Sequence, residues 1–255
     1  MTTPVPTVAA ALLQAHRTGR PADAAPLAGQ LQTPADAYAV QDEVARGLGW
    51  FGDAGPRHWK SGGPSRQAAL THAPLPPGNV RSSPAGMRDV PFQLRLIEAE
   101  IALRLGRDVT AAQAAALTHD GAPSWLDGMA VSIEIVDSRW QQARDAETLL
   151  KLADLQSHGA LALGDWRPFE ARDWSAQECR VRIGAGPWQT FRGTHSLGDP
   201  AWLLPLWLRH ATRHGATVGA GTVVTTGTWC GLLSAQAGDR VEVEFPGVGT
   251  AAVQL

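Results

Sequence analysis

The chain has 255 residues, enough for one large domain or for one domain with a smaller appendage. Charged residues make up 18% and the formal net charge is −2, so neither a nucleic acid nor an anionic membrane surface is expected as a partner. No stretch approaches the roughly 20 apolar residues of a transmembrane helix, and the N-terminus lacks the basic segment of a signal peptide, which together predict a cytoplasmic protein outside the membrane.

Two helices are predicted in the first fifty residues. Residues 6–19 carry an apolar stripe that ends at a glycine. Residues 33–49 begin with Thr33 as a candidate N-cap and Pro34 at the first helical position, and apolar residues follow at helical spacing. Residues 62–91 are rich in Pro, Gly and Ser, which predicts a long irregular loop of the kind that often covers a binding site.

From about residue 92 the pattern changes to strands and turns, which favours an α+β fold over alternating βαβ units. Strands are expected at 94–105, 128–140, 160–164, 178–184, 187–193 and 221–231, with a closing hairpin at 238–255. Helices are expected at 145–159 and at 199–215, the second with a kink at Pro205. The predicted organisation is a helical region at 1–60, a loop region at 61–91 and a strand-rich body at 92–255.

Two glutamates interrupt the apolar strand predicted at residues 94–105. Glu98 and Glu100 lie two residues apart, so in a strand both side chains project from one face, about 7 Å apart. Glu242 and Glu244 repeat this spacing, also near an arginine, which shows that the pattern is common in a half-solvated strand. For the pair alone, a solvated face is therefore the favoured interpretation.

A third glutamate changes this balance. Glu134 lies in the middle of the apolar strand predicted at 128–140, where a carboxylate is costly unless it is paired or well hydrogen-bonded. A salt bridge to Arg139 is one explanation. The other is convergence with Glu98 and Glu100 on a hard divalent cation, since oxygen ligands suit Mg²⁺ or Mn²⁺. The residues alone leave both explanations open.

Several segments, in their order along the chain, resemble the fumarylacetoacetate hydrolase superfamily. The nearest branch is that of the 2-keto-4-pentenoate hydratases and oxalocrotonate decarboxylases. The segments are IEAEIALRLGRD at 97–108, SIEIVDSRW at 132–140, LADLQSHGALALG at 152–164, HWKSGG at 58–63 and AGTVVTTGTWCG at 220–231. The resemblance implies a helical N-terminal region packed on a mixed β-roll, and assembly into homo-oligomers.

The resemblance also implies a site and its chemistry. It assigns Glu98, Glu100 and Glu134 as ligands of Mg²⁺ or Mn²⁺, and Lys60 as a group that transfers a proton. Such a metal polarises the carboxylate and 2-oxo group of a small 2-oxo or 2-hydroxydienoic acid. Burial and the nearby cation are expected to lower the pKa of Lys60 and make its proton available. A surface ammonium is the alternative for this lysine.

Weaker expectations concern the substrate contacts. By resemblance, Thr226 and Thr228 border the substrate carboxylate, although ordinary strand threonines explain them equally well. Ser65 falls where relatives often have a hydroxyl after the lysine.

Relatives also carry an aspartate in the loop at residues 70–85, where this chain has Pro77 or Asn79. Asparagine takes up no proton at neutral pH, so His195 or water is expected to replace that acid. The predicted function is a metal-dependent hydratase that adds water to a small 2-hydroxydienoate in aromatic meta-cleavage catabolism. The alternatives are a decarboxylase of a 2-oxo diacid, an acylpyruvate-type C–C hydrolase and a non-catalytic partner subunit.

Overall fold

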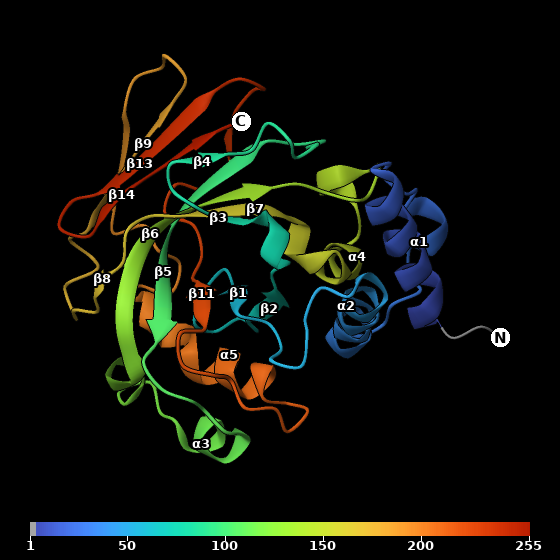
Figure 1. Cartoon of the computed structure of the whole chain (residues 1–255), viewed down its shortest axis with the longest axis horizontal. Coiled ribbons are helices and arrows are strands. Elements are labelled where there is room, and N and C mark those ends of the chain that lie inside the picture. Colours follow the sequence, from blue (N-terminus) through green and yellow to red (C-terminus); the bar gives the residue numbers. More distant parts are fainter. Residues whose placement is uncertain (1–3) are drawn as a thin grey trace.

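A strand-rich body with a helical layer at one end makes up the computed structural model, which describes residues 4–255 (Figure 1). Helices α1 (Pro4–Thr18) and α2 (Pro34–Leu48) pack against each other, and α2 packs against α4 (Thr148–Ala153). Their apolar faces share one core with Trp140, which follows the strand that carries Glu134. The helical layer is thereby packed against the segment around Trp140 that follows this strand.

Local signals set the start of α2 as the sequence predicts. Thr33 accepts a hydrogen bond from the backbone N–H of Asp36, whose side chain accepts one from the backbone N–H of Thr33. This reciprocal arrangement satisfies two N–H groups that a helix start leaves without partners. Pro34 occupies the first turn, where its missing N–H has no consequence. Within residues 4–255, no helix combines the length and apolarity needed to cross a bilayer.

The larger sheet is mixed and has the order β2-β1-β11-β5-β6-β7-β3, with β8 beside β6 and β12 beside β5. Its strands are β1 (His58–Gly62), β2 (Thr71–Pro74), β3 (Val80–Ser82), β5 (Leu96–Leu105), β6 (Leu126–Val136), β7 (His158–Leu163), β8 (Arg167–Pro168), β11 (Val223–Thr225) and β12 (Leu233–Ser234). The antiparallel strands β5 and β6 form its centre. An early segment, β1, lies parallel beside the late segment β11.

The smaller sheet has the order β10-β9-β13-β14-β4 and packs on β6 through β13 and β14 (Figure 1). Its strands are β4 (Ala85–Gly86), β9 (Glu178–Ile183), β10 (Gln189–Arg192), β13 (Arg240–Phe245) and β14 (Gly249–Gln254). The two sheets enclose a core of buried aliphatic and aromatic side chains. The predicted α+β fold, a helical region on a mixed β-roll, is confirmed.

Three local predictions need correction. The segment 62–91 is not wholly irregular, because β2, β3 and β4 lie within it and pair with distant strands. The helix expected at 145–159 ends at Ala153. The helix expected at 199–215 is a 3₁₀ turn, Pro200–Leu203, followed by α5 (Leu204–Ala211), so Pro205 lies in the first turn of α5 and does not kink it. A further short helix is α3 (Ala111–Ala116).

Candidate metal centre

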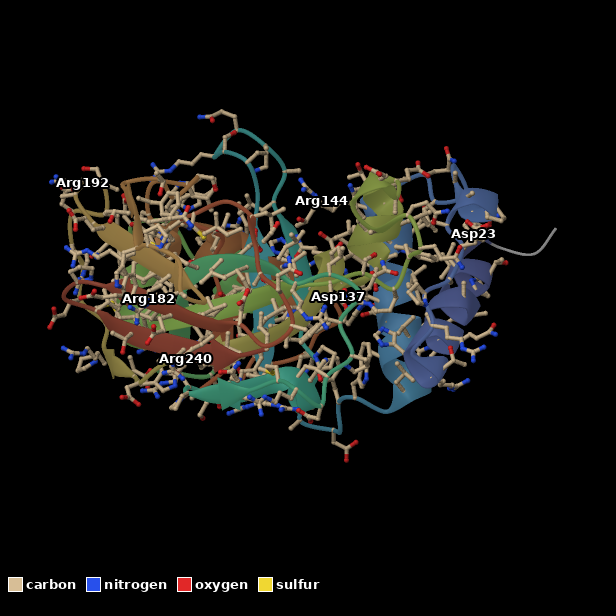
Figure 2. All side chains as sticks on the ribbon, turned by 90° about the horizontal axis from the view of Figure 1, so that it is seen from above. Asp23, Asp137, Arg144, Arg182, Arg192 and Arg240 are labelled. Carbon is tan, nitrogen blue, oxygen red and sulfur yellow. The ribbon has the colours of Figure 1, made fainter. Side chains whose placement is uncertain are left out.

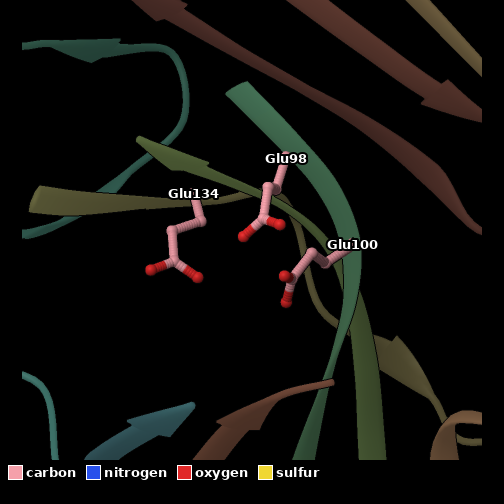
Figure 3. Close-up of side chains that lie close together, drawn as sticks. All are labelled: Glu98, Glu100 and Glu134. Carbon is pink, nitrogen blue, oxygen red and sulfur yellow. The ribbon is translucent and has the colours of Figure 1, made fainter. Parts of the chain in front are cut away.

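β5 and β6 bring three glutamate side chains together (Figure 3). Glu98 and Glu100 project from one face of β5, and Glu134 lies directly opposite Glu98 on β6. One carboxylate oxygen of each glutamate lies within 4.8 Å of the other two. Glu100 is 2% exposed and Glu134 is fully buried. The solvated face that the E-x-E spacing favoured is therefore wrong for this pair.

Glu134 is held by two nitrogen donors. Lys60 Nζ lies 2.6 Å from Glu134 Oε1, and His158 Nδ1 lies 2.9 Å from the same oxygen. Because a carboxylate only accepts, the hydrogen of the neutral His158 ring is on Nδ1. Arg139, the partner considered from the sequence, instead forms an ion pair with the buried Asp154. That alternative for Glu134 is wrong, because Arg139 projects from beyond the end of β6.

Lys60 lies on β1, where it is paired in register with Thr225 of β11. Its ammonium donates to Glu134 and to the carbonyl oxygen of Gln156, at 3.3 Å. An ammonium has three N–H donors, so one remains for the cavity that Lys60 lines. The side chain is 11% exposed, which excludes a surface ammonium.

Glu100 is held by β11 and the turn that follows it. Thr225 Oγ1 donates to Glu100 Oε2, and the backbone N–H of Gly227 donates to the same oxygen at 3.0 Å. The Thr225 hydroxyl also lies 2.9 Å from Ser132 Oγ on β6. These contacts fix the orientation of one carboxylate across three strands of the sheet.

The carboxyl groups differ in how readily they ionise. Burial, Glu100 and Glu134 raise the pKa of Glu98 to about 8, against the opposing effect of Lys60. Burial and Glu134 raise the pKa of Glu100 to about 7. Burial also disfavours the Glu134 carboxylate, but Lys60 and His158 outweigh it and hold the pKa of Glu134 below its ordinary value. Glu134 is therefore the carboxylate that Lys60 balances, and the other two lack a cation of their own.

The pKa of Lys60 depends on the charges around it. Burial lowers it, but the charges of Glu134, Glu98 and Glu100 together raise it above the ordinary lysine value. The lowered pKa expected from the sequence refers to a centre that holds a cation, so it stays a prediction. Neutralising the glutamate charges would leave burial as the dominant effect, and burial favours release of the proton.

The donor set suits a hard divalent cation. Three carboxylates supply only oxygen, and Glu134 Oε2 is a buried atom without a hydrogen-bond partner among residues 4–255. An unsatisfied buried carboxylate oxygen is unfavourable, and coordination would satisfy it while removing the repulsion that raises the pKa values of Glu98 and Glu100. The residues present therefore fit a divalent metal.

The centre opens into a cavity of about 780 Å³, within the usual range of about 300–1,000 Å³ for small-molecule sites. Its lining includes Lys60, Ser61, Glu98, Glu100, Arg144, Lys151, Gln156, Ser157, Thr225 and Thr228. The wall is apolar over much of its area. Such a cavity admits a small organic acid.

A strained turn forms part of this wall. Leu155, Gln156 and Ser157 of the 3₁₀ turn η5 (Leu155–Ser157) all have φ between 50° and 59°. This left-handed conformation costs roughly 1–2 kcal/mol for each non-glycine residue. The turn directs the Gln156 carbonyl to Lys60 and leads directly into His158. The helix expected over 145–159 cannot continue through it.

The other residues named from the sequence lie at different distances from the cavity. Thr228 lines it. Thr226 is buried and donates to the carbonyl oxygen of Ile101, and Ser65 accepts from the N–H of Gln67 in a surface turn.

His195 and Asn79 both have structural partners. His195 lies behind the cavity wall, with Nε2 2.8 Å from the Thr226 carbonyl oxygen and Nδ1 accepting from the N–H of Leu197. Burial lowers the pKa of His195. Asn79 Nδ2 donates to the carbonyl oxygen of Gly159 at 2.8 Å. In this conformation neither side chain faces the glutamates with a free proton-transfer group.

Sequence reasoning missed three contacts at the centre. Thr225, the neighbour of Thr226, holds Glu100, and strand alternation could have identified it once one threonine was known to point inward. His158 was not separable from the other histidines. The role of the Gln156 carbonyl had no sequence signal, because it depends on a backbone conformation that non-glycine residues rarely adopt.

Comparisons with known proteins show the family of the chain. Residues 75–255 match the family model for the fumarylacetoacetate (FAA) hydrolase C-terminal domain. The 2-keto-4-pentenoate hydratase 1 of Dechloromonas aromatica (strain RCB) is 31% identical over 159 residues, which are 60% of this chain and 57% of that relative. The 2-hydroxyhexa-2,4-dienoate hydratase of Comamonas testosteroni is 29% identical over 164 residues, 62% of this chain and 59% of that relative. The chain thus matches less than two thirds of the length of these relatives.

A solved structure extends the similarity to the helical layer. The 4-oxalocrotonate decarboxylase from Pseudomonas putida G7, complexed with magnesium and adipate, has a TM-score of 0.82 and covers 98% of this chain and 96% of that chain. The sequence identity is 19%, so this likeness concerns the fold alone. The family model covers most of the chain. The chain therefore belongs to the fumarylacetoacetate hydrolase superfamily.

Proposed function

We propose that this protein is a lyase that adds water to a small 2-hydroxydienoate of the 2-keto-4-pentenoate type, with Mg²⁺ or Mn²⁺ held by Glu98, Glu100 and Glu134. The observation that carries the proposal is the triad of carboxylates, two of them buried and one half-buried, with Lys60 Nζ 2.6 Å from Glu134. The names of the relatives, two of them hydratases, support the reaction type. The magnesium in the similar decarboxylase structure supports the choice of metal.

The chemistry divides between the metal and the chain. A bound divalent cation supplies Lewis-acid polarisation of the carboxylate and 2-oxo oxygens of the substrate. Lys60 holds a proton at Nζ beside the glutamates and directs one N–H into the cavity. Glu134 and the Gln156 carbonyl orient this ammonium by accepting its other two N–H groups. The apolar part of the wall limits the water that reaches the dienoate chain.

Proton transfer is assigned to Lys60 because its neighbours control its charge. The three glutamates raise its pKa, and a divalent cation held by them would oppose this effect. A lysine ammonium can release and recover a proton, whereas an arginine stays protonated. His195 is not needed as a base in this scheme, and a water molecule in the cavity is the reactant that adds to the double bond.

The test is turnover of 2-hydroxypenta-2,4-dienoate by the purified protein with and without Mg²⁺, followed as loss of dienol absorbance. We expect turnover that depends on the metal, and its loss in Glu100→Gln. The matched control is Glu242→Gln, which alters the other E-x-E pair, where Glu242 is bound by the surface Arg182. Absence of metal-dependent turnover with this acid and with longer dienoates would contradict the proposal.

A second candidate is decarboxylation of a 2-oxo diacid of the oxalocrotonate type. The similarity in fold over nearly the whole chain to a decarboxylase favours it. It requires the same polarised 2-oxo acid but a second anionic group on the substrate. Release of carbon dioxide from 2-oxohex-3-enedioate, without hydration of the monoacid, distinguishes this reaction from the first.

A further inference from the structure

The cavity has a cationic wall that the proposed chemistry does not use. Arg144 lies in the 3₁₀ turn η4 (Ala143–Asp145) and Lys151 lies in α4, and both line the cavity that contains Glu98 and Glu100. Lys60 and Lys151 are the only lysines in the sequence, so both lysines of the chain line this one cavity. Figure 2 shows Arg144 where the strand-rich body meets the helical layer.

Neither cation has an acidic partner. Among residues 4–255, no carboxylate oxygen lies within 4.0 Å of the Arg144 guanidinium or the Lys151 ammonium. Arginines elsewhere do have such partners, for example Arg139 with Asp154 and Arg81 with Asp89. Two cations without acidic partners in the wall of a cavity favour an anionic ligand, because a bound anion interacts favourably with both of them.

The pair is held in position by its own segment. Lys151 Nζ donates to the carbonyl oxygen of Arg144 at 2.9 Å, which ties η4 to α4. Trp140 Nε1 donates to the carbonyl oxygen of Leu150 at 2.9 Å, and both residues lie in the core shared with α1 and α2. Ala143, just before Arg144, has the left-handed φ of 50°. The helical layer therefore fixes the backbone that presents both cations.

The same segment reaches the metal centre. α4 ends at Ala153, and the turn that follows it places the Gln156 carbonyl 3.3 Å from Lys60 Nζ. Because Glu98, Glu100, Arg144 and Lys151 all line one cavity, a molecule bound there can contact the glutamate centre with one end and the cationic pair with the other.

We propose that Arg144 and Lys151 bind a second carboxylate on a ligand, remote from the 2-oxo acid group, so that a 2-oxo diacid binds more tightly than the matching monoacid. This inference rests on the proposed function, because it takes the 2-oxo acid end to lie at the glutamates. The planar guanidinium of Arg144 can bind a carboxylate through two parallel hydrogen bonds, and Lys151 adds a point charge beside it. The cavity volume of about 780 Å³ also exceeds what a five-carbon acid fills. The assignment concerns the substrate and applies equally to hydration and to decarboxylation.

The test compares two acids that differ only at the remote end. 2-Oxoadipate ends in a carboxylate and 2-oxohexanoate ends in a methyl group, and binding of each is measured by calorimetry in excess Mg²⁺. The wild-type protein is expected to bind 2-oxoadipate at least about tenfold more tightly, the size of one charged hydrogen bond. This preference should decrease at high salt, because Arg144 is exposed and its charge is screened.

Variants separate the subsite from the metal centre. Arg144→Gln and Lys151→Gln should each reduce the preference for 2-oxoadipate and leave the affinity for 2-oxohexanoate unchanged, which also shows that the variants are folded. Arg144→Lys should restore part of the preference. Arg192→Gln is the matched control, since Arg192 is exposed on β10 at the far end of the body in Figure 2.

The possible failures are distinguishable. Equal affinities of the wild-type protein for the two acids, with no effect of Arg144→Gln, would overturn the subsite while leaving the proposed function intact. Loss of binding of both acids on removal of Mg²⁺ or in Glu100→Gln is expected if the glutamates hold the 2-oxo acid end. If neither acid binds to the wild-type protein in Mg²⁺, the subsite inference fails together with the proposed binding mode.

Discussion

Glu98 and Glu134 occupy directly opposite positions on the neighbouring strands β5 and β6. Like charges in this arrangement destabilise a sheet, and Lys60 contacts only one of the two carboxylates. The metal-free protein therefore keeps two carboxyl groups close together with a single ammonium to balance them. A bound cation or the loss of one carboxyl group would relieve this unfavourable arrangement.

The first prediction concerns thermal stability. Mg²⁺ should raise the melting temperature of the wild-type protein. At a Mg²⁺ concentration 100 times the dissociation constant, the free energy of unfolding should increase by about 2.7 kcal/mol. Glu98→Gln should raise the stability of the metal-free protein, because it replaces a carboxyl whose pKa is raised to about 8 on folding with a neutral amide, and should abolish the further gain from Mg²⁺. Differential scanning calorimetry measures both effects. Glu244→Gln on β13 is the control, and an equal Mg²⁺ response in Glu98→Gln and wild type would exclude the site.

The second prediction separates the charge of Lys60 from its proton. Lys60→Met should lower kcat/KM by about 10²–10⁴-fold, the range for loss of a general acid or base. Lys60→Arg should be nearly as inactive, because arginine keeps the positive charge but does not release a proton near neutral pH. Steady-state kinetics with saturating Mg²⁺ measure this. Retention of activity in Lys60→Arg would show that the ammonium acts only through its charge.

The third prediction compares two neighbouring threonines. Thr225→Val removes the hydroxyl that donates to Glu100 and should weaken Mg²⁺ binding by about 10–100-fold, as for other groups that orient a metal ligand. Thr226→Val removes a hydrogen bond to the Ile101 carbonyl, so it should reduce stability by about 1–3 kcal/mol and leave Mg²⁺ affinity unchanged. Calorimetric titration and urea unfolding give the two quantities. The same loss of affinity in both variants would mean that general disorder is the cause.

The fourth prediction concerns the left-handed turn. Ser157 has φ of 59°, and glycine takes this conformation without a steric penalty. Ser157→Gly should therefore increase the free energy of unfolding by about 1 kcal/mol, and Ser157→Val should decrease it by more than that amount. Urea unfolding of the two variants checks the sign. Destabilisation by both substitutions would show that the Ser157 side chain contributes more than the backbone strain.

The fifth prediction concerns pH. His72 is buried against the ring of His210, and burial lowers the pKa of His72 from 6.5 to about 3. Between these values the unfolded chain binds a proton that the folded chain does not, so stability is present above pH 6.5 and is lost as the pH falls. The loss should reach about 1.4 kcal/mol per pH unit below 6.5. His72→Gln should reduce this slope in urea unfolding between pH 7.5 and 5, and His119→Gln, with an exposed ring, is the comparison.

The parts of the centre that could be predicted from the sequence are those set by local spacing. The period of two along a strand places Glu98 and Glu100 on one face, and the apolar residues around Glu134 mark it as a buried carboxylate that needs a partner. The start of α2 is also predictable, because the capping hydrogen bonds between Thr33 and Asp36 join residues that are close in sequence.

The rest depends on pairings between distant segments. Nothing near Lys60 in sequence indicates that β1 lies beside β11, so its place at the centre was expected only through resemblance to a family, and its contact with Glu134 was not expected. His158 and Thr225 were not distinguished because their roles depend on register across the sheet. The turn at Gln156 opposes the local preference of its residues, and only the surrounding packing and hydrogen bonds explain a conformation that its sequence disfavours.

The position of β1 limits how the chain can be divided. The segment that matches the family model begins at residue 75 and contains all three glutamates, but Lys60 lies before it. A fragment cut at residue 75 would leave Glu134 without its ammonium and β11 as an open edge in the larger sheet. The segment that matches the family model is thus not an electrostatically complete unit, because β1 and β2 from outside it complete the sheet and β1 supplies the ammonium of the centre.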